Sequence, residues 1–310
     1  MTRSKTFLII TGIFVLFGFR MSEQAQDANS DWMRVQSDDG EFSIEVPTSY
    51  KYYPNSAGFI TTAAGGNQEY LLKNMRMFTS FENGSLLSFE VYEANRGALE
   101  ALFDQDSHKH EDVKVSTIKN ADFSIKQIFT VSDDYYCVRR FFYSKNNIYI
   151  LTAASREGET ASIKRFFDSL EFDPDSKATP KSDVAKLSSL KATEISVGSD
   201  LNAPAPPKKP DKQKPAAKKK KDKNDLIILT RPRPSYVESA RHGNVQGTVR
   251  IKANFEKDGF MPEVVVLKKL PEGLLRQALI AAIRIRFLPK IENGKPVSAV
   301  KLIEYEFDIF

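Results

Sequence analysis

The sequence predicts an α+β fold with two domains that are joined by a disordered linker rich in proline and lysine. Alternating apolar residues, which are typical of β-strands, occur in residues 31–174 and again in residues 226–310. Short helical patterns lie among these segments. Residues 175–224 have few aromatic residues and no sustained periodicity, so they cannot bury enough apolar area to become ordered. A chain of 310 residues is long enough for two such domains.

The N-terminal segment, residues 1–28, has the pattern of an export signal. Residues 7–19 form an uncharged apolar run that follows Arg3 and Lys5. A membrane-spanning helix needs about 20 apolar residues, and this run is shorter, as in the apolar part of a signal peptide. We therefore expect export with cleavage of the signal. An uncleaved anchor in the inner membrane is the alternative.

Residues 31–174 are expected to form a meandering antiparallel sheet with a few helices. "EFSIEVP" alternates between apolar and polar residues, and Asn83-Gly84 is a strong hairpin signal between two apolar runs. "ALEALF" and "ASIKRFFDSLEF" have helical spacing, and Thr160 is expected to cap the second helix. The single cysteine, Cys137, lies in the strand-like stretch "YYCVRRFFY" and is expected to be a buried, small apolar residue.

The lysine run, residues 206–224, carries nine Lys, four Pro and two Asp. The rest of the chain has 36 basic and 38 acidic residues, so the folded parts are near neutral, which disfavours nucleic-acid binding. The run also lacks interleaved aromatic residues for base stacking. We expect a solvated spacer and no nucleic acid, with weak contact to anionic envelope surfaces as the alternative.

Residues 226–310 are expected to form a three-stranded antiparallel sheet with helices. Ser235 and Glu238 have the spacing of a capping box, and a helix is expected from Pro271 to Pro289. "GTVRIKANF" and "EVVVLKK" flank an Asp-Gly turn and predict two strands. The final strand "VKLIEYEFDIF" alternates, and its apolar residues are expected to face inward. These residues are Ile303, Tyr305, Phe307 and Ile309.

The sequence contains no recognisable catalytic constellation. "HKHED", residues 108–112, carries two His, but a four-coordinate metal site needs ligands from more than one place. No nucleophile elbow, zincin motif, phosphate loop or paired-cysteine motif occurs. We expect no enzyme activity, no metal and no cofactor.

An ordered set of features in the C-terminal quarter resembles the C-terminal domain of the TonB family of energy transducers. They are "RPSYVESARHG", "VQGTVRIKANFEKDG", "VVVLK", a helix ending in "RIRFLP", and the final alternating strand. Among the residues that carry the resemblance are Pro234, Tyr236, Gly247, Gly259, Arg286, Phe287 and Pro289. Family members also have Pro/Lys-rich spacers before this domain, which supports the interpretation of the lysine run as a spacer.

The resemblance implies a bacterial cell-envelope protein whose C-terminal domain binds an outer-membrane receptor or a periplasmic protein by β-strand addition. It also implies energy transduction for transport through an inner-membrane motor complex driven by the proton-motive force. The candidate binding residues lie on the final strand, which is expected to be an edge. They are Lys301, Ile303, Tyr305, Glu306 and Phe307. The alternative is a core strand that binds no partner and whose Glu304, Glu306 and Asp308 only discourage aggregation.

Two departures from the family pattern lead to an alternative function. The family's anchor carries a functional His, whereas His108, His110 and His242 all lie outside the N-terminal segment of this chain. In addition, a whole domain lies between the N-terminal segment and the spacer. The alternative is a secreted periplasmic adaptor that uses the TonB-like domain as an interaction module and transmits no force.

Residues 31–174 resemble, more loosely, the PsbP/Mog1-like domains of exported proteins. The resemblance rests on "WMRVQSDDGEFSIEVP" at the start and on "IYILTAAS" and "FFDSLEF" at the end. That fold is associated with no single activity, so the resemblance implies an α+β fold and no particular ligand.

Overall fold

A computed structural model gives the fold of ten stretches of the chain. The described residues are 32–37, 40–54, 61–65, 68–107, 113–119, 124–144, 146–172, 184–186, 189–202 and 223–308. They belong to one compact unit, Asp31–Phe310. The predicted signal segment, "HKHED" and nearly all of the lysine run lie outside them. No helix in these ten stretches is long and apolar enough to cross a membrane.

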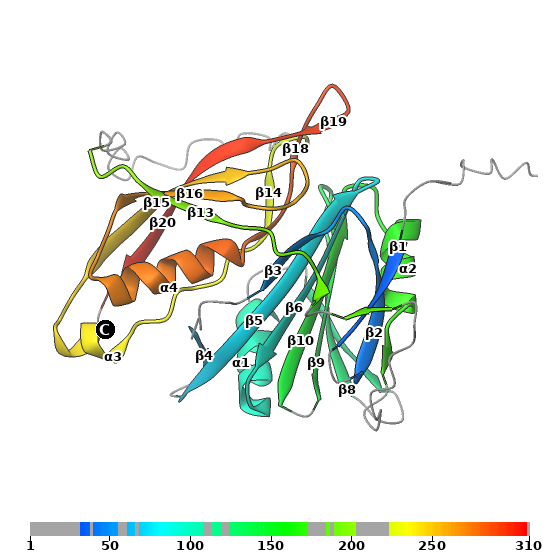
Figure 1. Ribbon diagram of the computed structural model, residues 1–310, viewed down its shortest axis with the longest axis horizontal. Helices are drawn as coiled ribbons and strands as arrows, with labels where there is room; N and C mark the ends of the chain where they lie inside the picture. Colours follow the sequence, from blue (N-terminus) through cyan, green and yellow to red (C-terminus); the bar gives the residue numbers. More distant parts are fainter. Residues whose placement is uncertain are drawn as a thin grey trace, which may run out of the picture. The chain divides into compact units, whose positions relative to one another are not determined.

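The N-terminal region contains an eight-stranded antiparallel sheet (Figure 1). Its order is β3-β5-β6-β10-β9-β8-β7, and β4 pairs with β5 outside this path. The strands are β3 (Lys51–Pro54), β4 (Thr61–Gly65), β5 (Gln68–Glu82), β6 (Ser85–Glu93), β7 (Val113–Lys119), β8 (Ser124–Val131), β9 (Tyr136–Ser144) and β10 (Asn147–Ser155). The β5–β6 hairpin turns at Asn83-Gly84, where both residues have positive φ, as the sequence predicted.

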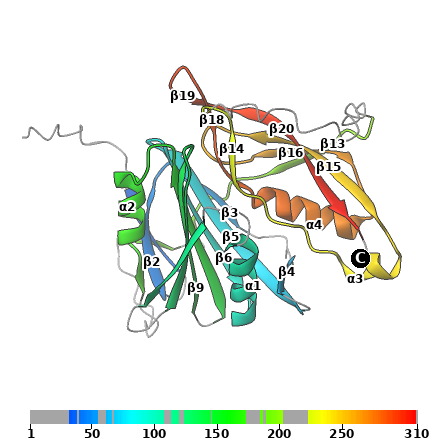
Figure 2. The same cartoon turned by 180° about the vertical axis from the view of Figure 1, so that it is seen from behind.

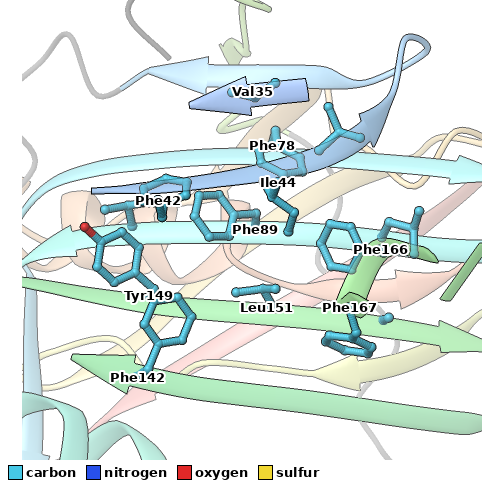
Figure 3. Packing of buried hydrophobic residues seen from close by; sticks show 14 of the residues in the cluster. Val35, Phe42, Ile44, Phe78, Phe89, Phe142, Tyr149, Leu151, Phe166 and Phe167 are labelled. Carbon is cyan, nitrogen blue, oxygen red and sulfur yellow. The ribbon is translucent and has the colours of Figure 1, made fainter. Parts of the chain in front are cut away.

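A second, four-stranded sheet and the helices α1 and α2, which are labelled in Figure 2, complete this region. The sheet order is β11-β2-β1-β12. Its strands are β1 (Trp32–Gln36), β2 (Phe42–Pro47), β11 (Glu171–Phe172) and β12 (Ala185–Lys186), and the helices are α1 (Arg96–Ser107) and α2 (Ala161–Asp168). The main core combines residues of β2, β6, β10 and α2, among them Phe42, Phe89, Tyr149 and Phe166 (Figure 3).

Strand β6 is buried on both faces. Leu87, Phe89 and Val91 belong to the main core. The residues between them, Ser88 and Glu90, are also buried, although they point to the opposite face. A strand that is covered on both sides needs a second layer of structure, and here this layer includes residues of the C-terminal region.

The C-terminal region is built on a four-stranded sheet of order β13-β16-β15-β20, and α4 lies along one face of this sheet (Figure 1). These strands are β13 (Ser196–Ser199), β15 (Gly247–Phe255), β16 (Glu263–Lys268) and β20 (Ala299–Phe307). Two small sheets pair β14 (Ile227–Thr230) with β17 (Arg286–Leu288) and β18 (Lys290–Glu292) with β19 (Lys295–Val297). The helices are α3 (Glu238–His242) and α4 (Glu272–Ile283).

The expected three-stranded sheet and structureless linker need correction. Three antiparallel strands, β16, β15 and β20, are present, but β13 adds a fourth strand parallel to β16. Strand β13 and the buried Leu190 both lie in the stretch that was expected to be disordered. The expectation is wrong for these residues, because neighbouring strands supply the pairing and burial that the stretch cannot provide for itself.

Two helix boundaries also differ from the prediction. Helix α4 begins after Pro271 but ends at Ile283, so "RFL" is not its last turn. These three residues form β17, whose pairing with β14 outweighs the local helical pattern. Helix α3 has Val237 as its N-cap with no side-chain cap, so the expected capping box with Ser235 does not form. Thr160, in contrast, caps α2 as predicted by accepting a hydrogen bond from the Ile163 amide at 3.2 Å.

Candidate functional site

A groove of about 510 Å³ lies beside the C-terminal half of β20. One wall is the segment from Arg231 to Tyr236, and the other is formed by residues 304–308. This groove brings together two sets of residues that the sequence singled out separately. They are Pro234 and Tyr236 from the first set and Tyr305, Glu306 and Phe307 from the second.

The first wall follows β14 but does not continue as a strand. Pro232 and Pro234 have no backbone N–H, and each favours an extended conformation in the residue before it. The segment therefore runs beside β20 without forming a ladder. It is fixed instead by Arg231, whose guanidinium donates to the backbone carbonyl of Glu304 and lies 5.3 Å from the centre of the Tyr305 ring.

Tyr236 closes one end of the groove. Its hydroxyl donates to the backbone carbonyl of Val245, and its ring meets Phe307 edge-on with 5.8 Å between ring centres. The Arg241 guanidinium lies 5.8 Å from the centre of the same ring. The residue is therefore held from three sides, which makes this end of the groove rigid.

The second wall follows the alternation that the sequence predicted. Ile303, Tyr305 and Phe307 are buried in the core, and Glu306 is exposed. Burial raises the pKa of the Tyr305 hydroxyl well above its usual value, although the positive charge of Arg231 opposes this shift. Glu304 accepts a hydrogen bond from Arg250 on β15 at 2.8 Å. The buried side chains of β20 belong to the core, so only the backbone and the exposed side chains of this strand can contact a partner.

The N-terminal half of β20 is more open. Val300 is 60% exposed and Leu302 is 43% exposed, and the two are on the same side of the strand. Lys301 is exposed and lies 3.5 Å from the Asp225 carboxylate. Among the described strands, β20 pairs only with β15, so it forms one end of its sheet. This edge and its two exposed apolar side chains lie next to the groove along the strand.

Four other residues that carry the family resemblance lie away from the groove or support the fold. Gly247 begins β15 with a φ of 137°, and Gly259 lies in the β15–β16 turn with a φ of 78°. Phe287 is buried against Phe255, edge-on at 4.9 Å between ring centres, and Pro289 is buried next to β17. These positions shape the sheet and its core.

Arg286 is buried where the C-terminal region meets the N-terminal region. Its side chain is 2% exposed, and one terminal nitrogen lies 3.0 Å from a carboxylate oxygen of Glu90 on β6. A residue of the TonB-like region therefore pairs with a residue of the N-terminal region. Sequence reasoning missed this pair because nothing local relates two positions so far apart in the chain.

The described residues offer no alternative site with metal chemistry. No group of three or more His, Cys, Asp or Glu side chains in this part of the chain is placed to hold a metal ion. The groove presents two Arg side chains on one wall and acidic side chains on the other, and it adjoins the open edge of β20 at residues 299–303. This arrangement suits an extended polypeptide.

One family model matches part of the C-terminal region. Residues 232–309 match the family described as Gram-negative bacterial TonB protein C-terminal. The matched residues include both walls of the groove except Arg231. No curated protein matches the chain.

Two solved structures are similar to parts of the chain. One is the C-terminal domain of TonB from Pseudomonas aeruginosa, at 26% identity over 27% of this chain and 87% of that one, with a TM-score of 0.25. The other is the cyanobacterial PsbP protein of Synechocystis sp. PCC 6803, at 8% identity over 49% of this chain and 99% of that one, with a TM-score of 0.30.

Proposed function

We propose that the chain is a TonB-like cell-envelope protein whose C-terminal domain binds an extended segment of an outer-membrane receptor or a periplasmic protein. The observation that carries the proposal is the open edge of β20 beside the groove, within the residues that match the TonB family. The proposed partner segment adds to this edge as a further strand.

Strand addition uses main-chain hydrogen bonds for affinity and alternate side chains for specificity. The buried residues of β20 fit this mechanism, because a partner strand needs only the backbone at those positions. Arg231 already donates to the carbonyl of Glu304, so it competes with a partner strand for that group. We therefore place the binding register chiefly over residues 299–303, and the groove receives the adjoining residues of the partner segment.

The exposed side chains of β20 define the chemistry of the partner segment. Val300 and Leu302 favour apolar side chains at alternate positions of the added strand, since cross-strand neighbours contact each other. Glu306 and Asp308 are exposed at the other end and favour a basic residue there. The proposed ligand is thus an extended segment with alternating apolar residues and a basic end.

Site-specific photo-crosslinking in cells of the native organism tests this proposal. A photoreactive amino acid at Leu302 is expected to form an adduct with an outer-membrane or periplasmic protein. The matched control is Val197, which is 55% exposed on β13 at the opposite end of the same sheet. Adducts of equal yield from both positions, or no adduct from Leu302, would show that the edge of β20 is not the binding site.

A secreted periplasmic adaptor that transmits no force is a second candidate function. The pairing of Arg286 with Glu90 favours it, because a C-terminal region bound to its neighbour lacks the free reach that a spacer gives. The two candidates share the groove and its partner class. They differ in whether the N-terminal segment anchors the chain to the inner membrane and its motor complex.

A further inference from the structure

A buried ion cluster joins the C-terminal region to the N-terminal sheet. Arg286 lies 3.0 Å from Glu90, and Arg284 lies 3.9 Å from the other carboxylate oxygen. Arg284 also donates to the Tyr92 hydroxyl at 2.8 Å, and this hydroxyl donates to Glu90. All three charged side chains are at most 8% exposed.

The arginines of this cluster come from the end of α4 and the start of β17, and the acid comes from β6. Arg286 donates from one nitrogen to the carbonyls of Ile283 and Ile285, which fixes its direction. The other terminal nitrogen contacts both the Glu90 carboxylate and the Met77 sulfur. Glu90 on β6 and Met77 on β5 lie directly opposite each other in the sheet. The arginine is therefore aimed at one cross-strand pair of the N-terminal sheet.

Apolar contacts surround the ion cluster on both sides. Ile283 packs with Tyr92, Ile148 and other residues of the N-terminal sheet. Leu229 and Leu288, from β14 and β17, form a second cluster with Leu86, Cys137 and Ala154. The second cluster consists of two C-terminal residues and three N-terminal ones, so the contact is a continuous packed interface.

A buried charge is stable only when it is paired and hydrogen-bonded. Each arginine would lose its acidic partner, and Glu90 both of its basic ones, if the two regions separated. In the separated state water would solvate these groups. The cluster therefore makes the contact specific for one geometry.

We propose that the N-terminal sheet is a docking surface for the chain's own C-terminal region, and that Glu90 holds the docked state through Arg286 and Arg284. The inference does not depend on what binds at β20. While the regions are docked, the end of α4 and β17 is unavailable to any other partner. The TonB-like domain is then one half of a rigid pair and not a module that moves freely on its linker.

Cys137 provides a direct test in the full-length protein. It is 6% exposed and lies under Leu229 and Leu288, so undocking should expose its thiol. We expect Glu90→Gln to raise the rate of reaction with a thiol reagent under native conditions by at least tenfold. The matched control is Glu93→Gln, at the exposed end of the same strand, which should react at the wild-type rate. Equal rates in the two variants would overturn the proposal.

A double-mutant comparison tests whether Glu90 and Arg286 act as a pair. Arg286→Gln alone should also raise the reaction rate, because it leaves Glu90 without its closest partner. The double variant Glu90→Gln, Arg286→Gln should react more slowly than the product of the two single effects predicts, since the pair is already broken by one change. Independent effects that multiply would show that the residues do not act as a docking pair.

Cleavage of the linker gives an independent measurement. A protease site inserted within residues 203–222 allows the folded chain to be cut after β13, so that β13 stays with the N-terminal fragment and its pairing with β16 is the same in every variant. We expect the wild-type fragments to elute together in gel filtration and the Glu90→Gln fragments to elute apart. Separate elution of the wild-type fragments would refute docking.

Discussion

Gly259 combines a positive φ with a close approach to the N-terminal sheet. A Cβ atom at this position would lie 2.9 Å from Cδ1 of Leu86 and 3.2 Å from Cβ of Phe81. The turn therefore needs glycine for two reasons, its backbone conformation and the space that it leaves. Gly84 has a similar φ of 72° but no atom within 4 Å of the same added Cβ.

Substitutions at these two glycines separate the energetic cost of the backbone conformation from the cost of the close contact. Gly84→Ala is expected to lower the free energy of unfolding by about 1–2 kcal/mol from the backbone conformation alone. Gly259→Ala should lower the free energy of unfolding by about 1–3 kcal/mol more than this, because the added methyl group overpacks the contact. Urea unfolding of both variants measures the difference. Equal losses of unfolding free energy in the two variants would mean that the close approach to Leu86 does not affect stability.

Glu90 is expected to make the stability of the protein sensitive to acid. Burial raises the pKa of this carboxyl, but the nearby Arg286, Arg284 and Arg139 outweigh burial, so the pKa is lowered below its ordinary value of 4.5. A carboxyl whose pKa is lower in the folded protein than in the unfolded protein stabilises the fold. This stabilisation is fully present above the pKa of the unfolded state, and it is lost as the pH falls through the pKa of the folded state. Wild-type protein should therefore lose stability below about pH 4.5.

The variant Glu90→Gln should lack this part of the acid dependence. Its free energy of unfolding is expected to be lower than that of the wild type at pH 7, and the difference should shrink at pH 3. Urea titrations at the two pH values measure this. A constant difference at both would contradict an ionised, paired Glu90.

Among the elements, α2 has an N-cap that can be tested by itself. Thr160 accepts from the Ile163 amide, and its hydroxyl also lies 2.7 Å from that of Ser85. Thr160→Ala should cost about 1 kcal/mol in unfolding free energy because the helix loses its cap. Thr160→Ser keeps the hydroxyl and should cost much less. Similar losses in both variants would show that the Thr160 methyl group, and not the cap, is important.

Elements with strong local signals could be predicted from the sequence. Thr160, Asn83-Gly84 and the alternation of β20 each act within a few residues, and the structure has them as expected. β17 could not be predicted, because its strand pairing depends on β14, more than fifty residues earlier in the chain. β13 could not be predicted either, because its side chains are largely exposed and only its backbone pairs with β16.

The groove was predictable only in pieces. Tyr236 and Tyr305 were identified from separate segments, and their proximity became visible in the fold. Arg231 was missed, because its contact with the backbone of Glu304 joins two segments that are far apart in the sequence. Val300 and Leu302 were also missed, because the alternation of this strand points instead to the residues that face the core.

At the scale of the whole molecule, the sequence did contain one sign of docking. The runs "SLLSFEVYE" and "IYILTAAS" are nearly continuous in apolar and small residues, and the structure buries β6 and β10 on both faces. Continuous runs of this kind are typical of strands that are covered on both sides. The identity of the covering layer could not be predicted, because it is set by contacts such as Glu90 with Arg286.

The fate of residues 1–28 decides between the two candidate functions. We predict that the native protein, recovered from fractionated cells, lacks about the first 25 residues and is found in the periplasmic fraction. Intact-mass measurement checks both points. A full-length mass in the inner-membrane fraction would instead support the anchored transducer.

The pairing of β15 with β20 also has a mechanical consequence. The two strands are in register from Gly247 opposite Phe307 to Phe255 opposite Ala299. Hydrogen bonds between antiparallel strands lie across the strand axis. A segment added along β20 and pulled lengthwise would load its bonds together in shear, whereas a pull away from the edge would break them one after another. The direction of the applied force, and not only the affinity of the bound segment, would then determine the force at which the segment detaches.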